Sequence, residues 1–134
     1  MDGVTLSPVK LILNPKGDIF HAIKSSDASF DGFGEAYFST VHAGTIKGWK
    51  KHTLMTLNLI VPCGAVEFVC FDGEAFQQVI LSKENYQRLT VRPGVWVAFR
   101  GVSNGLNLLL NVANIEHDPK ESESCGLEEI NYEW

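Results

Sequence analysis

The sequence has few positive charges and no long apolar run. Its 11 Lys and Arg residues stand against 16 Asp and Glu residues, for a formal net charge of −5. This balance argues against a nucleic acid polymer as the partner, because such partners need a basic surface. No apolar run reaches the length of a membrane-spanning helix, so we expect no membrane insertion. The first residues, Met1-Asp2-Gly3, do not begin a signal peptide, and we expect a cytoplasmic location.

Cysteine is also scarce. The three cysteines, Cys63, Cys70 and Cys125, are an odd number and have no metal-type spacing. They favour reduced thiols in a reducing compartment over a disulfide framework. Cys70 lies in the apolar run VEFVCFD and is predicted to be buried. A nucleophilic role for Cys63 has little basis, because no histidine lies next to it in the sequence.

Helical periodicity is almost absent, and short segments of strand character take its place. The chain has 134 residues, of which 45% are apolar and 20% are charged, enough for one domain with a real core. Turn signals such as Asn14-Pro15-Lys16-Gly17 and Asp72-Gly73 separate the segments. We expect strands at 9–13, 19–24, 35–42, 45–52, 54–61, 65–71, 76–81, 89–92, 95–100 and 106–113.

Nine or ten short strands with frequent turns predict an all-β sandwich or barrel. No strong breaker separates 45–52 from 54–61, which leaves open one bent strand in place of two. The run Ser82-Lys83-Glu84-Asn85 is predicted to form an N-capped helical turn. We expect 1–134 to form a single domain.

The last segment, 116–134, is predicted to be a C-terminal tail, because it is acidic and weakly patterned. Ile130, Tyr132 and Trp134 are apolar at alternate positions near its end. We therefore expect the end of the tail to dock either on the body of the protein or on a partner subunit.

The most distinctive stretch runs from Gly44 to Gly64, GTIKGWKKHTLMTLNLIVPCG. Strand alternation puts Lys50 and His52 on one face of this stretch. The same count puts Glu35, Tyr37 and Ser39 on one face of the preceding strand. If both faces point into a barrel, they form a pocket that can abstract a proton next to a ketone. A solvated strand end with no chemistry is the alternative for the Lys-Lys-His run.

The roles of these side chains follow from their chemistry. Histidine titrates near neutral pH, so His52 suits a general base. Lys50 could act as a base only if desolvated or crowded by Lys47 and Lys51. Lys47 and Lys50 could instead hold a diphosphate by charge. Four aromatic residues could stack on a base or a sugar: Tyr37, Trp49, Trp96 and Phe99. Asn58, polar in an apolar strand, either lines a pocket or satisfies backbone groups.

The spacing of this stretch resembles the first motif of the cupin family. Gly44 is followed by five residues, then by Lys50-Lys51-His52, and Gly64 closes the motif. Pro93-Gly94 matches the second cupin motif, with Val97 where that motif carries a metal-binding histidine. Of the four usual ligand positions, only His52 has the right chemistry. Stable sites use three or four ligands, so we expect no metal and no cofactor.

Within the cupins, the chain resembles dTDP-4-dehydrorhamnose 3,5-epimerases and the related dTDP-sugar ketoisomerases over roughly 15–119. The segment LSKENYQRLTVRPGVWVAF carries the more specific part of the match. Lys50 stands where the family has its catalytic histidine, Leu110 near its tyrosine, and Asn114 near the aspartate that orients the histidine. His52 corresponds to the second histidine of relatives that carry Trp-His-x-His.

The resemblance implies a cupin-type jelly-roll β-barrel that forms a homodimer. It also implies a metal-independent epimerase or isomerase that acts on a dTDP-linked, or similarly linked, 4-keto-6-deoxyhexose in surface polysaccharide biosynthesis. The catalytic residues would be His52, Lys50 and Tyr37. The residues expected to bind the nucleotide sugar are Glu35, Ser39, Lys47, Asn58, Trp96 and Phe99. One alternative is an inactive relative that binds a sugar nucleotide or a partner protein; another is an isomerase of an unrelated small sugar or keto acid.

Overall fold

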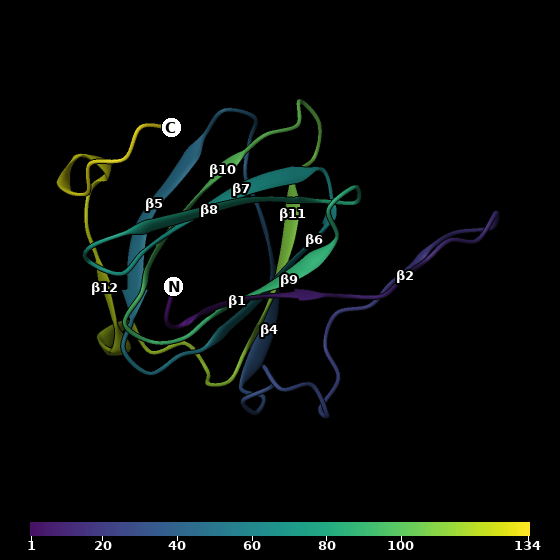
Figure 1. The fold of residues 1–134 in the computed structure, drawn as a ribbon, viewed down its shortest axis with the longest axis horizontal. Coiled ribbons are helices and arrows are strands. Elements are labelled where there is room, and N and C mark those ends of the chain that lie inside the picture. The colour runs from purple at the N-terminus through teal and green to yellow at the C-terminus, as the bar shows by residue number, and fades with distance from the viewer.

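A computed structural model describes all residues, 1–134, and shows two five-stranded antiparallel sheets that pack face to face (Figure 1). The first sheet has the order β1 (Val4–Pro8), β9 (Gln87–Val91), β6 (Leu57–Cys63), β11 (Leu108–Ala113) and β4 (Glu35–Thr40). The second sheet has the order β12 (Ser122–Ser124), β5 (Ile46–His52), β10 (Trp96–Gly101), β7 (Ala65–Phe71) and β8 (Phe76–Ser82). This arrangement confirms the predicted all-β jelly roll. No helix is long and apolar enough to cross a membrane.

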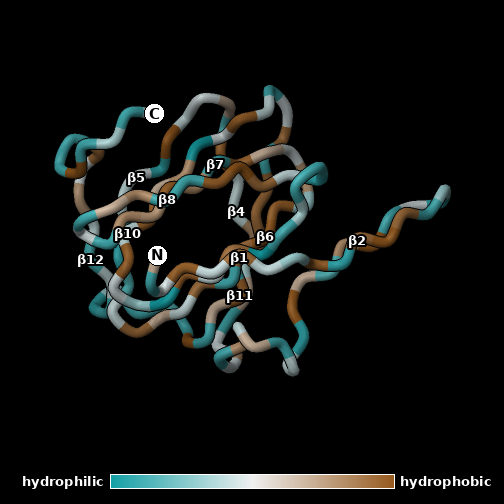
Figure 2. The backbone as a smooth tube through the Cα atoms, in the orientation of Figure 1, coloured by the Kyte–Doolittle hydropathy of each residue, from teal (hydrophilic) through white to brown (hydrophobic).

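The main hydrophobic core lies between the two sheets. Alternation along β7 explains how it is filled, because Val66, Phe68 and Cys70 point into this core. Val69 points the other way and packs with Trp49 and Ala98 in a second, smaller cluster. The strands of the body are rich in hydrophobic residues, whereas most connecting loops are hydrophilic (Figure 2). The second sheet therefore has an apolar outer face that needs a cover.

The C-terminal tail supplies this cover. It contains the 3₁₀ helix η1 (Pro119–Glu121), the strand β12, which pairs with β5, and the 3₁₀ helix η2 (Leu127–Glu129). Ile130 is 9% exposed and belongs to the second cluster. The Trp134 ring lies 6.2 Å from the Trp49 ring between centroids. The sequence left open whether the tail docks on the body or on a partner subunit, and in the structure it docks on the body.

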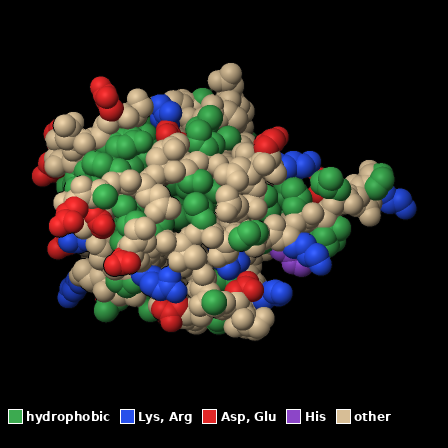
Figure 3. Space-filling model, in the orientation of Figure 1, with side chains coloured by type: hydrophobic (Ala, Val, Ile, Leu, Met, Phe, Trp, Pro, Cys, Tyr) green, Lys and Arg blue, Asp and Glu red, His purple; other side chains and the backbone are tan.

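A two-stranded arm projects from the body (Figure 1). It consists of β2 (Leu11–Ile12) and β3 (Ile19–Phe20), joined by a turn at the predicted 14–17. Hydrophobic residues lie along β2 (Figure 2), and hydrophobic and basic side chains share the arm surface (Figure 3). Leu13 is 69% exposed and Ile19 is 54% exposed, so the arm leaves apolar side chains in solvent.

Of the two arrangements left open for segments 45–52 and 54–61, the structure shows two strands, because β5 ends at His52 and β6 begins at Leu57 in the opposite sheet. Two other local features differ from the predictions. The run from Ser82 to Asn85 is a tight strand reversal, in which each of these two residues donates its backbone N–H to the carbonyl of the other. Val4–Pro8 was not expected to be a strand, yet it pairs with β9 over its whole length.

Candidate functional site

Two adjoining cavities bring the predicted polar residues together at one end of the jelly roll. The first has a volume of about 250 Å³ and lies between the two sheets. Its walls are Tyr37, Ser39, Lys47, Gly48, Lys50, His52, Leu57, Leu59, Val97, Phe99, Leu109 and Asn111. The second, of about 300 Å³, is lined by Glu35, Tyr37, Lys50, His52, Met55 and His117. Tyr37, Lys50 and His52 border both, so the two cavities form one candidate site.

A β-bulge in β5 shapes the basic side of the site. Val97 of β10 pairs with Lys50, and Phe99 pairs with Lys47, with a shift in register between the two pairs. The shift means that β5 has one more residue than β10 in this interval. Strict alternation would put Lys47 and Lys50 on opposite faces, whereas the extra residue lets both line the cavity. The aromatic residue between them, Trp49, is 1% exposed and packs behind the sheet.

Lys47 is held beside the apolar wall of the cavity. Its Nζ lies 3.3 Å from Ser39 Oγ and 5.9 Å from the centre of the Phe99 ring. Together with Lys50, it gives this cavity two positive charges and no carboxylate in its lining. Two ammonium groups against an aromatic wall suit an anionic ligand that also carries an apolar or ring-shaped part.

Tyr37 is oriented by a buried amide. Asn111 is 1% exposed, and its Nδ2 donates to the Tyr37 hydroxyl oxygen at 3.1 Å. Asn111 Oδ1 accepts the backbone N–H of Asn58 at 3.2 Å, which fixes the orientation of the amide. Because the hydroxyl oxygen accepts here, the Tyr37 O–H remains free to donate to a bound ligand.

His52 is paired with Glu121, a residue that the sequence did not suggest. His52 Nδ1 is hydrogen-bonded to Glu121 Oε1. The other carboxylate oxygen, Oε2, accepts the backbone N–H groups of Thr53, Leu54 and Met55 at 3.1–3.2 Å. With Nδ1 occupied, Nε2 is the ring nitrogen available to a ligand. The arrangement is a histidine oriented by a buried carboxylate, which suits a general base.

The environment of Glu121 keeps its side chain ionised. Burial by itself raises the pKa of this carboxyl, but the hydrogen bond from His52 and those from the amides of Leu54 and Met55 together lower the pKa below its ordinary value. The glutamate reaches this position because η1 ends there and β12 then pairs with the His52 end of β5. Asp118 caps η1 by accepting the N–H of Lys120.

Asn114 does not take the place of the orienting acid. Its Oδ1 accepts the backbone N–H of Thr56 at 2.7 Å, and its Nδ2 donates to Asp31. The sequence contained no pattern that pointed the Glu121 side chain at β5. Long-range pairing of the tail is what brings His52 and Glu121 together.

Seven of the nine residues predicted for the site line one or both cavities, and the other two lie elsewhere. Asn58 is 3% exposed and is bonded to Thr90 and to the carbonyl of Ser29, on the opposite face of β6. Trp96 packs with the second cluster, where Lys51 lies 5.1 Å above its ring. Alternation explains both positions, because each side chain points away from the space between the sheets. Their expected place in the pocket is therefore corrected.

Thiols and metal-type clusters play little part in the site. Burial raises the pKa of the Cys70 thiol to about 12, which fits the predicted inert core position. Cys63 and Cys125 are unpaired as well. No group of three or more His, Cys, Asp or Glu side chains is arranged to hold a metal ion.

The structure is a jelly roll with a polar site at one end of the space between its sheets, and this site contains a histidine oriented by a carboxylate. These features define a cupin-type barrel with a site for small-molecule chemistry. The family model described as "FdtA: WxcM-like, C-terminal" matches residues 2–123. The chain belongs to this family, which confirms the resemblance to the dTDP-sugar ketoisomerases and epimerases. No curated protein matches the chain.

Solved structures of similar proteins agree with this assignment. A dTDP sugar isomerase from Desulfovibrio desulfuricans G20 is 33% identical, with a TM-score of 0.89 over 93% of this chain and 85% of that one. The sugar 3,4-ketoisomerase QdtA from Thermoanaerobacterium thermosaccharolyticum, solved with TDP, is 22% identical, with a TM-score of 0.80 over 92% and 88%. The TDP-quinovose 3,4-ketoisomerase WlaRB from Campylobacter jejuni is 16% identical, with a TM-score of 0.79 over 93% and 95%. The last two support the fold alone.

Proposed function

We propose that this protein isomerises or epimerises a nucleotide-linked 4-keto-6-deoxyhexose, with thymidine diphosphate as the nucleotide, for surface polysaccharide biosynthesis. The observation that carries the proposal is that His52, which lines a cavity with two lysines, is paired with the buried Glu121. Similarity to a dTDP sugar isomerase at 33% identity supports the substrate class.

The reaction begins with His52 as the general base. Its Nε2 takes the proton from the carbon next to the 4-keto group, and the electron pair of the broken C–H bond passes into an enolate. Glu121 holds the ring in the tautomer in which Nδ1 carries the proton. It also stabilises the imidazolium that forms. The role resembles that of the family's aspartate, although the carboxylate comes from the tail.

The enolate oxygen needs a hydrogen-bond donor. Two side chains that border both cavities can donate to it: the hydroxyl of Tyr37 and the ammonium group of Lys50. The Tyr37 O–H is free to do so because its oxygen accepts from Asn111. Return of a proton to the same carbon from the other face gives an epimer. Return of a proton to the former carbonyl carbon, with transfer of the neighbouring hydroxyl proton to the enolate oxygen, moves the ketone by one position. Both outcomes balance without a cofactor.

Binding of the nucleotide follows from charge and shape. Lys47 and Lys50 would hold the diphosphate, with Ser39 supporting Lys47 and the Phe99 ring forming the apolar wall. Glu35 borders the second cavity only and would accept hydrogen bonds from sugar hydroxyls.

The direct test is deuterium incorporation from heavy water into a dTDP-4-keto-6-deoxyhexose. We expect exchange at the carbon next to the ketone with the wild-type chain and a loss of at least about 100-fold in rate with His52→Ala, as for removal of a general base. His42→Ala is the matched control, because His42 is exposed and lines neither cavity.

Two outcomes would contradict the proposal in different ways. No exchange above background, together with a rise in melting temperature on addition of thymidine diphosphate, would identify an inactive relative that only binds the nucleotide. Neither exchange nor stabilisation by the nucleotide would remove sugar nucleotides as ligands altogether.

We also propose that the protein is a homodimer, in which the arms formed by β2 and β3 contact the second copy. The exposed apolar residues Leu13 and Ile19 support this, since solvated apolar patches of this kind mark interaction surfaces. Light scattering should give twice the chain mass for the wild type and a shift to the monomer for Ile19→Asp, whereas Lys16→Asp should leave the dimer intact. A cytoplasmic location fits the three unpaired cysteines.

A further inference from the structure

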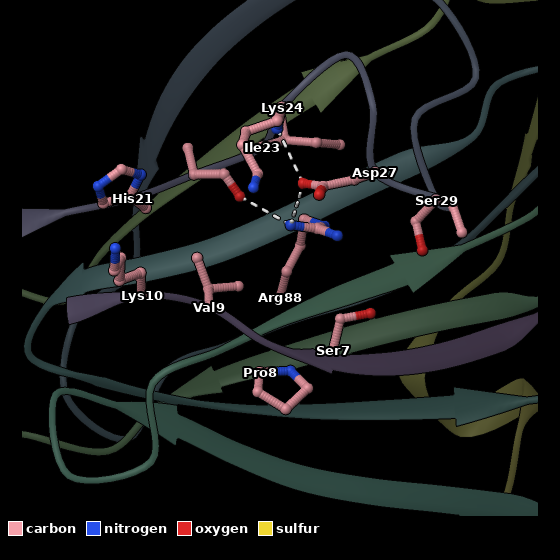
Figure 4. Close-up of a pocket in the computed structure, with 12 residues that line it drawn as sticks. Ser7, Pro8, Val9, Lys10, His21, Ile23, Lys24, Asp27, Ser29 and Arg88 are labelled. Atoms are coloured by element: carbon pink, nitrogen blue, oxygen red, sulfur yellow. Dashed lines mark hydrogen bonds and ion pairs between the residues drawn. The ribbon is translucent and has the colours of Figure 1, made fainter.

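A third cavity lies outside the jelly roll, at the base of the projecting arm (Figure 4). It has a volume of about 510 Å³ and is bounded by β1, residues 9 and 10 before β2, segment 21–29 and β9. Arg88 reaches it from β9, whereas its neighbour Leu89 points into the main core. The cavity therefore opens on the outer face of the first sheet, and it shares no lining residue with the candidate active site.

The lining of this outer cavity is basic. Lys10, Lys24 and Arg88 contribute cations, His21 adds an imidazole, and Asp27 is the only carboxylate. Three of the 11 basic residues of a chain with a net charge of −5 thus meet at one place. Figure 3 shows basic side chains and a histidine at the base of the arm.

Arg88 is buried with its hydrogen bonds incomplete. It is 4% exposed, and its Nη1 donates to the carbonyl of Ala22 at 2.9 Å and to Asp27 Oδ2 at 3.4 Å. The same carboxylate oxygen accepts the backbone N–H of Lys24 at 2.8 Å, so it is shared. Arg88 Nε is buried without a partner. A buried guanidinium with free donors is costly unless an anion completes its hydrogen bonds.

Four other side chains around the cavity carry donors without protein partners. No hydrogen bond or ion pair engages the ammonium group of Lys10 or Lys24, and the hydroxyls of Ser7 and Ser29 line the same space (Figure 4). Guanidinium, ammonium and hydroxyl donors around one space are the groups that bind phosphate oxygens. The volume exceeds what a single phosphate fills and falls in the range of small-molecule sites.

We propose that the outer cavity is a second ligand site that binds a phosphate group, either free phosphate or the phosphate of a small phosphorylated molecule. Arg88 supplies the fixed donors, and Lys10, just before the arm, and Lys24, in segment 21–29, bind the phosphate by charge. The proposal does not depend on the reaction proposed for the space between the sheets, because the two sites have separate lining residues.

The test is a titration of the full chain with inorganic phosphate, followed by backbone amide NMR at constant ionic strength set with chloride. We expect saturable shifts at Ala22, Ile23 and Arg88. The variant Lys10→Gln/Lys24→Gln should raise the dissociation constant at least tenfold. Both lysines are exposed, so the variant is expected to fold.

Two control variants isolate the site. Lys16→Gln/Lys83→Gln removes the same charge from positions outside every cavity and should leave the affinity within about twofold of the wild type. Lys47→Gln/Lys50→Gln removes the lysines of the candidate active site and should leave the shifts at Ala22 and Arg88 in place. A parallel titration with glucose 1-phosphate distinguishes the sources: tighter binding than phosphate indicates an ester, and equal binding indicates the free ion. The proposal is overturned if phosphate causes no saturable shifts there or binds the Lys10/Lys24 variant equally well.

Discussion

At the scale of single residues, the site depends on how each polar side chain is held. His52 and Tyr37 are each fixed by one buried partner, Glu121 and Asn111. Both partners are almost fully buried, so they restrict the orientation of the reacting groups before any substrate arrives. The residues expected to carry out the chemistry could be predicted from strand alternation, whereas Glu121 could not.

Glu121→Gln tests the positioning role. The glutamine keeps the size of the side chain but removes its charge, so it no longer stabilises the imidazolium of His52. We expect kcat to fall by about 100-fold, with KM nearly unchanged, because Glu121 lines neither cavity. Steady-state kinetics measures both constants. Wild-type kcat in a folded variant would show that Glu121 has only a structural role.

At the scale of elements, the tail has two tasks. Its 3₁₀ helix η1 and strand β12 bring Glu121 to the end of β5, and its last residues cover the apolar outer face of the second sheet. The alternating Ile130, Tyr132 and Trp134 predicted that the end would dock. The sequence did not indicate the bulge in β5. Its only glycine in that strand, Gly48, lies in a run that is equally compatible with a regular strand.

Ile130→Ala measures how much the cover contributes. Removing the side chain leaves a cavity beside Trp49 and Val69, so we expect the free energy of unfolding to fall by about 2 kcal/mol. Urea denaturation followed by tryptophan fluorescence gives the value. Glu133→Ala is the matched control, since Glu133 is exposed, and it should change stability by less than about 0.5 kcal/mol. Equal effects of the two changes would mean that the tail is not anchored by Ile130.

At the scale of the whole molecule, stability should depend on pH through Glu121. Its pKa in the folded protein is lower than the ordinary glutamate value of 4.5. A carboxyl with a lowered pKa stabilises the fold fully above its unfolded-state pKa, and this stabilisation is lost as pH falls through the folded-state value. The pKa values of Asp18 and Asp72 are lowered as well, by local hydrogen bonds.

We therefore expect the melting temperature to fall as the pH drops from about 5 toward 3. Glu121→Gln should be less stable than the wild type at neutral pH, and it should lose less stability over the acid range. Differential scanning calorimetry at several pH values makes the comparison. Parallel curves for the two proteins would mean that other groups cause the acid sensitivity.

The sequence alone determined the fold class and the family, and it placed some of the site residues on the correct strand face. Short alternating segments between turn residues admit few arrangements other than two packed sheets, and the same alternation is sufficient to assign Lys50 and His52 to one face of their strand. Local alternation is predictable because the backbone geometry of a strand fixes the relative positions of neighbouring residues.

Only the tertiary structure decided which distant residues meet. The pairing of β12 with β5 brings Glu121 to His52 across 69 positions of the chain, and the bulge in β5 puts Lys47 beside Lys50. The packing of segment 21–29 over β9 creates the outer cavity around Arg88. These contacts follow from long-range packing, whose energy depends on the whole core, and no local pattern in the sequence specifies them.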